Sequence, residues 1–390
     1  MSARMTGLAI TVAVGTRPEV IKLAPVVAAL RRAGHEVRCV ATGQHSDPRL
    51  YSDLFLEMGC EPDAVWSLEG DEGQRVGQLL TAAYRDLATH PPDAVLVLGD
   101  THTAPLTALA ARRAGVGVIH LEAGLRSYNE RSMEESNRRA VAALATVHLA
   151  PTELAAEHLR LEGVHESRIR VVGNSVLDAM REMGAVRHPL AERSGHLLTA
   201  HRATNVDDPE RLAALMDVVR GLASRPGGVL FPVHPRTRDR LLAAGSWDEL
   251  SAMPGVDAVE PLSYSVMLAA LARSRVVVTD SGGLQEEASF LGVPVVVMRA
   301  TTPRWESVST GAAILCGLDA GRVLRAVDTF GVAGELERIE ALACPYGDGR
   351  TADRVVEVLA DEAVRRLLVP RDPVLGEGPG LVHGVRRAAG

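Results

Sequence analysis

Val276-Val-Val-Thr-Asp-Ser-Gly-Gly-Leu-Gln-Glu-Glu287 is the stretch around which the rest of the chain can be arranged. Its run of β-branched residues is typical of a buried parallel strand, and Gly282-Gly283 allows a sharp turn into a helix over 284–291. The first amides of a helix lack partners within it and lie at the positive end of its dipole, so this turn can seat a phosphate group. An ordinary βα turn has the same sequence pattern, so this stretch indicates a phosphate site only together with the residues predicted around it.

The alternation of strand and helix extends over most of the chain in both directions. Strands that alternate with helices form βαβ units and parallel sheets. Two such blocks predict two Rossmann-like α/β domains facing across a cleft, at residues 1–175 and 176–368, with the change of domain within 173–178 and 187–195 and an irregular tail at 369–390. The predicted strands are 8–14, 37–41, 94–98, 116–121, 147–150, 169–172, 196–200, 228–233, 256–259, 276–279, 293–298 and 312–315.

Composition narrows the class of protein. A chain of 390 residues is too long for one compact core, and its net charge of −7 argues against broad nucleic-acid binding. The four cysteines include no CxxC pair, so neither a zinc site nor a disulfide framework is indicated. The start lacks a secretory signal and no apolar run reaches membrane-spanning length, which predicts a cytoplasmic protein without a membrane partner.

Polar residues follow the predicted strands, at the edge where parallel sheets bind their ligands. The second half of the chain supplies helix amides, arginines and histidines suited to a diphosphate. The first half supplies the carboxylates of Asp100, Glu122 and Glu134, suited to proton transfer. The turn Gly15-Thr-Arg-Pro-Glu19 lacks the GxGxxG glycines and no P-loop is present, so a tightly held NAD is not expected.

A series of short motifs runs through the chain in a fixed order. They are Gly15-Thr-Arg-Pro-Glu-Val-Ile-Lys22, Thr42-Gly-Gln-His45, Gly99-Asp-Thr101, His120-Leu-Glu-Ala-Gly-Leu-Arg126, Glu134-Glu-Ser-Asn-Arg138, Gly173-Asn-Ser-Val-Leu-Asp178, His201-Arg202, Pro232-Val-His234, Thr279 to Glu287, Val297-Met-Arg299 and Pro345-Tyr-Gly-Asp-Gly349. With these motifs the chain resembles the non-hydrolysing UDP-N-acetylglucosamine 2-epimerase family, whose fold is like that of glycosyltransferase B (GT-B-like). The resemblance implies removal of the proton at C2 of the sugar with anti elimination of UDP, a bound 2-acetamidoglucal, and return of UDP with protonation from the other face. It implies no metal or nicotinamide cofactor and, by analogy, a homodimer.

The resemblance also assigns residues to roles. It carries over Asp100, Glu122 and Glu134 as acid/base carboxylates, without deciding which removes the proton and which returns it. Such carboxylates, gathered in a closed cleft, would raise one another's pKa. His201 is expected to balance charge on the departing UDP. The residues implied in binding UDP or the sugar are Arg17, Lys22, Arg138, Arg202, His234, Ser281, Gly282, Gly283 and Glu287, the last of these at the ribose.

Some positions differ from the residues that are usual in the family's motifs. His201-Arg202 is followed by Ala203-Thr-Asn205, where the family usually has a carboxylate, and Asp100-Thr101 is followed by His102 instead of a small polar residue. Gln44-His45 is followed by Ser46-Asp47 near the place where bacterial members bind a second, activating UDP-N-acetylglucosamine. We therefore expect activation through a second site at Gln44 and His45 to be weak or altered.

Three other functions fit the same sequence motifs less well. A hydrolysing relative would release free N-acetylmannosamine and UDP through the same elimination. A GT-B glycosyltransferase would need one base near an acceptor, whereas the first half offers three carboxylates. A sensor that only binds nucleotide sugars would not need those carboxylates at all.

Overall fold

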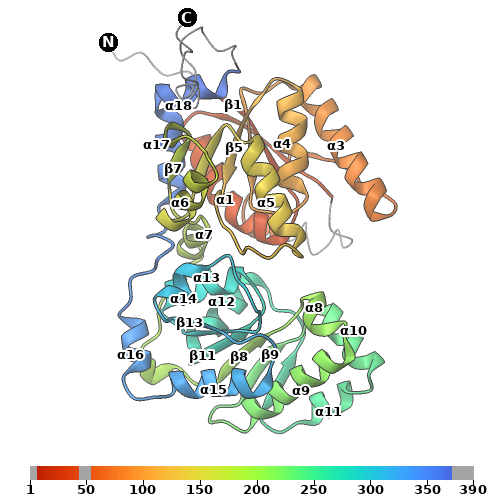
Figure 1. The fold of residues 1–390 in the computed structure, drawn as a ribbon, viewed down its shortest axis with the longest axis vertical. Helices are drawn as coiled ribbons and strands as arrows, with labels where there is room; N and C mark the ends of the chain where they lie inside the picture. Colours follow the sequence, from red (N-terminus) through yellow and green to blue (C-terminus); the bar gives the residue numbers. More distant parts are fainter. Residues whose placement is uncertain (1–6, 44–53, 371–390) are drawn as a thin grey trace, which may run out of the picture. The chain divides into compact units, whose positions relative to one another are not determined.

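The computed structural model describes residues 7–43 and 54–370, which form two α/β units (Figure 1). Among them, the residues up to Gly124, from Ser136 to Val172 and from Ala352 onward belong by their contacts to the first unit. Leu125–Glu135 and Gly173–Thr351 belong to the second. The chain thus returns to the first unit at Ala352, whereas the sequence-based boundaries keep all of 176–368 in one domain. Gln44, His45 and the tail after Pro370 lie outside the described residues.

The first unit is built on a parallel sheet of seven strands in the order β3-β2-β1-β4-β5-β6-β7. Its register aligns Leu98 with Leu121, so the ends of β4 and β5 are neighbours. The elements are β1 (Ala9–Val14), α1 (Arg17–Arg32), β2 (Glu36–Ala41), β3 (Ala64–Val65), α3 (Glu72–Thr89), β4 (Ala94–Leu98), α4 (Thr103–Arg113), β5 (Gly117–Leu121), α5 (Met133–Leu144), β6 (Val147–Ala150), α6 (Glu153–Leu161), η1 (Glu166–Arg168), β7 (Ile169–Val171), α17 (Thr351–Ala360) and α18 (Glu362–Leu368).

The second unit repeats this plan with six parallel strands in the order β10-β9-β8-β11-β12-β13. Its elements are α7 (Val176–Glu182), η2 (Leu190–Glu192), β8 (His196–Thr199), α8 (Ala203–Val206), α9 (Pro209–Ala223), β9 (Val229–Pro232), α10 (Pro235–Ala243), α11 (Trp247–Ala252), β10 (Val256–Val259), α12 (Tyr264–Arg273), β11 (Val276–Thr279), α13 (Gly283–Leu291), β12 (Val295–Val297), α14 (Trp305–Ser309), β13 (Ala313–Leu315), α15 (Ala320–Phe330) and α16 (Glu335–Glu340).

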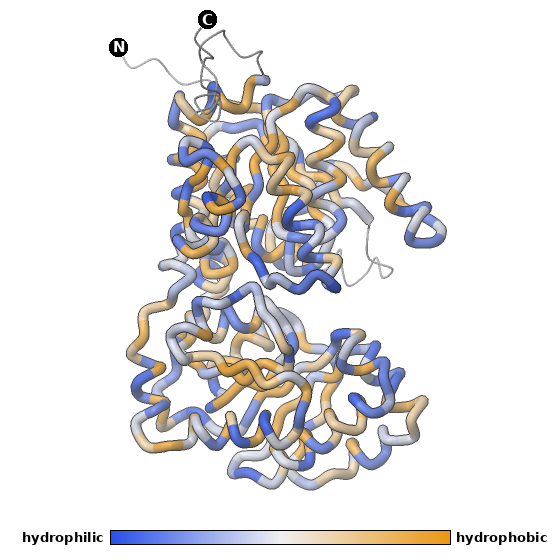
Figure 2. The backbone as a smooth tube through the Cα atoms, viewed as in Figure 1, coloured by the Kyte–Doolittle hydropathy of each residue, from blue (hydrophilic) through white to orange (hydrophobic). Residues whose placement is uncertain are grey.

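Each predicted strand overlaps a strand of the structure, and the predicted class of two parallel α/β domains with a GT-B-like fold is confirmed. Continuous apolar runs predicted the strands because both faces of each sheet are buried; in β4, β5 and β11 every residue is buried. Figure 2 shows the hydrophobic residues concentrated along the strands of each unit. The two-residue strand β3 was not predicted, because two residues carry no readable period.

Both sheets reverse their strand order beside the first strand of the unit. β1 lies between β2 and β4, and β8 lies between β9 and β11. In open parallel sheets, ligands bind beyond the carboxyl ends of the strands at such a reversal. The residues that follow β1 and β4, and those that follow β8 and β11, are therefore the places to look for chemistry. Within residues 7–43 and 54–370, no helix is long and apolar enough to cross a membrane.

Candidate active site

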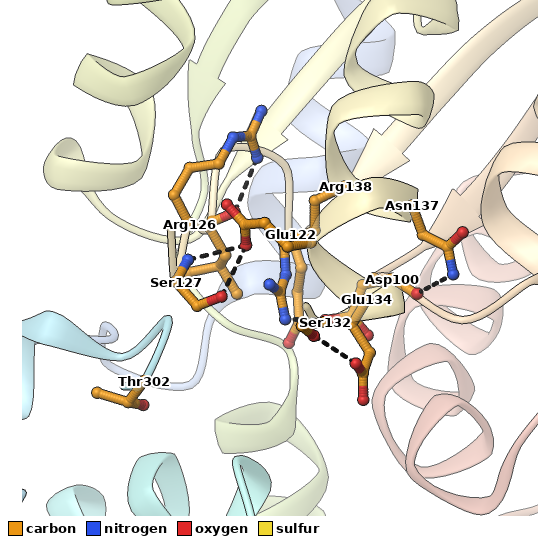
Figure 3. A network of polar contacts seen from close by, with 12 residues as sticks. Asp100, Glu122, Arg126, Ser127, Ser132, Glu134, Asn137, Arg138 and Thr302 are labelled. Carbon is orange, nitrogen blue, oxygen red and sulfur yellow. Dashed lines mark hydrogen bonds and ion pairs between the residues drawn. The ribbon is translucent and has the colours of Figure 1, made fainter. Parts of the chain in front are cut away.

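Asp100 follows β4 at the reversal of the first sheet and is held from two sides by helix α5. The Arg138 Nη2 lies 2.5 Å from its Oδ2, and the Asn137 side-chain amide donates to its backbone carbonyl at 2.8 Å (Figure 3). The Asp100 side chain keeps 26% of its surface exposed, whereas that of Arg138 keeps 6%. A buried cation thus orients a carboxylate that still meets solvent, which is the geometry that a proton-transfer group needs. The resemblance implies that Arg138 binds UDP or the sugar; in the structure its guanidinium is paired with Asp100.

Glu122 follows β5 and is a second carboxylate at the same edge. Its side chain is buried and forms an ion pair with the ammonium of Lys22 from α1. Its backbone has φ of 63°, a left-handed conformation that is uncommon for residues other than glycine and that persists only where the surroundings enforce it. A Cβ added to Gly99 would lie 3.7 Å from Glu122 Oε2, so this carboxyl lies beside the backbone that leads into Asp100. The resemblance implies that Lys22 binds UDP or the sugar; in the structure its ammonium is paired with Glu122.

Glu19, in the first turn of α1, is a buried carboxyl for which no role was predicted from the sequence. Its Oε2 accepts the Gly15 amide at 2.5 Å and its Oε1 accepts the Thr101 hydroxyl at 2.6 Å. Burial raises the pKa of the Glu19 carboxyl to about 7, against its hydrogen bonds and with a smaller contribution from the charge of Asp100. Glu19 thereby ties the turn after β1 to the residue that follows Asp100. These residues (Glu19, Lys22, Asp100, Thr101, Glu122 and Arg138) form the first-unit cluster.

The second unit presents the turn Ser281-Gly282-Gly283 between β11 and α13. A Cβ on Gly282 would lie 3.0 Å from Arg304 Nη1, whereas a Cβ on Gly283 would meet nothing within 4 Å. The guanidinium of Arg304 therefore packs against one side of the turn, held by Glu286 Oε1 at 2.8 Å, and the other side is open. An open helix N-terminus with an arginine beside it suits a phosphate group. Ser281 and both glycines are partly exposed, as such a role requires.

Asp280, at the end of β11, is the centre of the polar network in this unit. Its side chain is fully buried and accepts the backbone amide of Arg202 at 2.9 Å and that of His201 at 3.0 Å. The Nδ1 of His201 lies 3.0 Å from its Oδ1, and the side-chain amide of Asn205 donates to Oδ2 at 3.1 Å. Burial alone would raise the pKa of the Asp280 carboxyl, but hydrogen bonds from His201 and the two amides lower it below its usual range. No role was predicted for Asp280 from the sequence; in the structure Asp280 fixes His201 and Arg202.

Glu134 belongs to the second unit, whereas the sequence placed it with the other two carboxylates in the first. The unit boundary crosses the first turn of α5, between Glu135 and Ser136. Arg202 Nη1 lies 3.3 Å from Glu134 Oε1, and the Ser132 hydroxyl donates to its Oε2 at 2.5 Å (Figure 3). The neighbouring Glu135 is buried and accepts the Ser127 amide and hydroxyl, both at 2.9 Å, so it is a structural residue. Spacing along the sequence could not separate these two glutamates.

The remaining predicted residues fall into place more simply. Arg17 is partly exposed at the start of α1, and Glu287 is buried in the middle of α13. His234 caps α10, accepts the Arg236 amide at 3.2 Å on Nδ1, and has its ring centroid 5.5 Å from that of His201. Within the described residues, no group of three or more His, Cys, Asp or Glu side chains is arranged to hold a metal ion.

Three comparisons place the chain among known proteins. The family model described as UDP-N-acetylglucosamine 2-epimerase matches residues 28–360. The UDP-N-acetylglucosamine 2-epimerase of Methanocaldococcus jannaschii is 32% identical over 369 residues, which cover 90% of this chain and 98% of the relative. The UDP-2,3-diacetamido-2,3-dideoxy-D-glucuronate 2-epimerase of Pseudomonas aeruginosa is 33% identical over 359 residues, which cover 89% of this chain and 98% of the relative.

The fold agrees with that of a solved relative. The crystal structure of the Methanocaldococcus jannaschii UDP-GlcNAc 2-epimerase in complex with UDP-GlcNAc and UDP matches with a TM-score of 0.81 and 31% sequence identity. The match covers 90% of this chain and 99% of that one. The likeness therefore extends over both units and is not confined to the strand–turn–helix motifs.

Proposed function

The chain belongs to the UDP-N-acetylglucosamine 2-epimerase family, and from this premise we propose that it interconverts UDP-N-acetylglucosamine and UDP-N-acetylmannosamine without releasing the sugar. In this proposal UDP leaves as the C2 proton is removed, the 2-acetamidoglucal stays bound, and UDP then returns. The observation that carries the proposal is the family match over residues 28–360, which contains the oriented carboxylates Asp100 and Glu122 at one sheet reversal and the open Ser281-Gly282-Gly283 turn at the other.

The second unit, in this proposal, binds the nucleotide and stabilises the leaving group. The amides at the start of α13 and the Ser281 hydroxyl bind the diphosphate, and Glu287 accepts from the ribose. His201, held by Asp280 through Nδ1, turns its other ring nitrogen to the departing phosphate. Charge that develops on UDP as the C1–O bond breaks is what this unit must stabilise, because a C2 proton is only weakly acidic.

Proton transfer at C2 falls to Asp100, Glu122 and Glu134. Removal and return occur on opposite faces of the sugar, so one carboxylate cannot do both in a single turnover. Each of the three is already paired with a cation: Asp100 with Arg138, Glu122 with Lys22 and Glu134 with Arg202. Each pairing fixes the direction of its carboxylate, which places the oxygen atoms before the substrate arrives.

Incubation with UDP-N-acetylglucosamine in deuterated water tests the proposal, followed by NMR of the sugar. Epimerisation incorporates deuterium at C2 and leaves UDP attached in both epimers. Release of free N-acetylmannosamine with UDP would identify the hydrolysing reaction instead. If neither deuterium uptake nor free sugar is observed, the epimerising and hydrolysing reactions are both ruled out. That outcome would favour a glycosyltransferase, which cleaves the same bond only when an acceptor is present.

A second candidate substrate is favoured by the Pseudomonas aeruginosa relative, which is 33% identical and is named as acting on UDP-2,3-diacetamido-2,3-dideoxy-D-glucuronate. The same deuterium experiment with that nucleotide sugar separates the two, since C2 epimerisation proceeds through the same elimination. A much higher kcat/KM for the diacetamido sugar acid would transfer the proposal to it.

Three further features follow from the resemblance and complete the proposal. We propose a homodimer in the cytoplasm, to be checked by light scattering and by cell fractionation. We also propose that activation through Gln44 and His45 is weak. A hyperbolic rate curve for the reverse reaction without added UDP-N-acetylglucosamine agrees with this, and a strict need for that nucleotide sugar contradicts it.

A further inference from the structure

Glu287 has a hydrogen-bond partner that could not be expected from the order of residues along the chain. The hydroxyl of Tyr264, the first residue of α12, donates to Glu287 Oε1 at 3.1 Å. Both side chains are buried, with 6% of Tyr264 and 7% of Glu287 exposed. The tyrosine comes from a helix that precedes β11, so the contact joins two elements that are separate in sequence and packs α12 beside α13.

The chemistry of the pair makes Tyr264 the donor and Glu287 the acceptor. Burial, and after it the negative charge of Glu287, raise the pKa of the Tyr264 phenol far above its usual range, so the hydroxyl keeps its proton. Glutamate has three side-chain torsions, and a hydrogen bond from a rigid aromatic side chain removes much of that freedom. Tyr264 therefore fixes where the Glu287 carboxylate lies, about one helical turn beyond Gly283.

We propose that Tyr264 is a positioning residue that holds Glu287 toward the ribose hydroxyls and so makes the second unit select ribonucleotides. This inference rests on the proposed function, in which the turn at Ser281-Gly282-Gly283 binds the diphosphate and Glu287 the ribose. In this arrangement a nucleoside diphosphate seated on the start of α13 extends its ribose along that helix. A carboxylate fixed one turn further on then accepts from hydroxyls that a deoxyribose lacks.

Tyr264→Phe removes only the hydroxyl, and calorimetry measures the binding of UDP and of 2′,3′-dideoxy-UDP. We expect the wild type to bind UDP more tightly than the dideoxy nucleotide. In Tyr264→Phe we expect the ratio of the two dissociation constants to fall by about tenfold, because a hydrogen bond to a charged group is being lost. Binding of the dideoxy nucleotide itself should stay near the wild-type value, which a loss of structure would not allow. Thermal unfolding of the variant checks that it is folded.

Tyr346→Phe is the matched control. Tyr346 is also fully buried in the second unit, but its hydroxyl lies 2.7 Å from Ser307 Oγ, and the ratio should not change there. Equal weakening of both nucleotides in Tyr264→Phe, or an unchanged ratio, would overturn the inference.

Glu287→Gln separates this inference from the proposal beneath it. If Glu287→Gln loses the preference while Tyr264→Phe keeps it, Tyr264 has no positioning role although Glu287 still contacts the ribose. If Glu287→Gln keeps the wild-type ratio, the ribose contact is wrong and the inference falls with it. The deuterium experiment on the wild type decides the epimerase activity independently of both.

Discussion

Replacing Glu19 with glutamine should change how the stability of the first unit depends on pH. Glu19 is buried in the turn after β1 and holds the Gly15 amide and the Thr101 hydroxyl. A glutamine side chain at this position would keep one acceptor oxygen for these donors and turn an amide nitrogen toward the other. The substitution therefore costs stability at every pH, but it removes the titration entirely, and the titration is what can be measured.

The size of the effect follows from the two pKa values. Burial moves the pKa of the Glu19 carboxyl from 4.5 in the unfolded chain to about 7 in the folded one. Because the folded pKa is the higher, the contribution of the protonated Glu19 carboxyl to stability is fully present below pH 4.5 and is lost as the pH rises through about 7. Each pKa unit corresponds to about 1.4 kcal/mol, so the wild type should lose roughly 3 kcal/mol through this group by pH 8.5.

Urea unfolding at pH 5 and pH 8.5 measures this difference. Trp247 and Trp305 are replaced by Phe, so that Trp66, buried in the first unit, is the remaining fluorophore of the three tryptophans. Groups that do not interact with Glu19 contribute equally in both proteins, so they cancel in the difference between wild type and Glu19→Gln. From pH 5 to pH 8.5, the free energy of unfolding of the wild type should fall by roughly 3 kcal/mol relative to that of Glu19→Gln. A control that removes no titratable group, Thr81→Ala at an exposed position of α3, should show no shift, and the same flat result for Glu19→Gln would refute the reasoning.

Five other substitutions test the site. Asp100→Asn, Glu122→Gln and Glu134→Gln should each lower kcat by about 10²–10⁴ with little change in UDP affinity, and near-normal turnover in all three would remove them from the reaction. Ser281→Ala should weaken UDP binding by about three- to tenfold in calorimetry, since it removes one hydroxyl donor; an unchanged dissociation constant takes Ser281 out of the site. Asp280→Asn turns an amide toward the donors from His201 and Arg202, so kcat should fall by about a hundredfold while the fold, followed by circular dichroism, persists; normal kcat would contradict the role given to Asp280.

The fold was readable from the sequence because burial on both faces of a sheet leaves an unbroken apolar signal. The runs that end in Leu98, Leu121 and Thr279 are strands with every residue buried, and the polar residues that follow them reach the carboxyl edge of a parallel sheet by geometry alone. The turn at Gly282-Gly283 was equally accessible, since the chain must bend there between strand and helix. The structure adds the strand order, which shows that the residues after β4 and β11 lie where the strand order of each sheet reverses.

The partners of the charged side chains were not readable in the same way. Lys22 and Glu122 are 100 residues apart, and Arg202 and Glu134 are 68 apart, so neither pair leaves a local pattern. The spacing of four residues on a helix would pair Arg138 with Glu134, one turn away, yet the arginine reaches Asp100 after β4. Tertiary packing decides these pairs, because a nearly buried cation takes the carboxylate that packing brings to it. Glu19 shows the limit most clearly, since its burial has no signature in its neighbours.

The position of Glu134 changes how the labour is divided between the units. Separating an acid/base domain from a UDP domain would leave all three carboxylates on one side, but the segment Leu125–Glu135 belongs by contacts to the second unit. Asp280 holds Arg202, and Arg202 reaches Glu134, so the network that orients His201 also orients this acid. In the proposed function, the group that stabilises the leaving phosphate and one of the groups that move a proton are therefore linked through a single buried carboxylate. If the proposed elimination and proton transfer are to stay in step, one network within a single unit serves this better than two groups held by separate units, because His201 and Arg202 are both held by Asp280 and Arg202 in turn contacts Glu134.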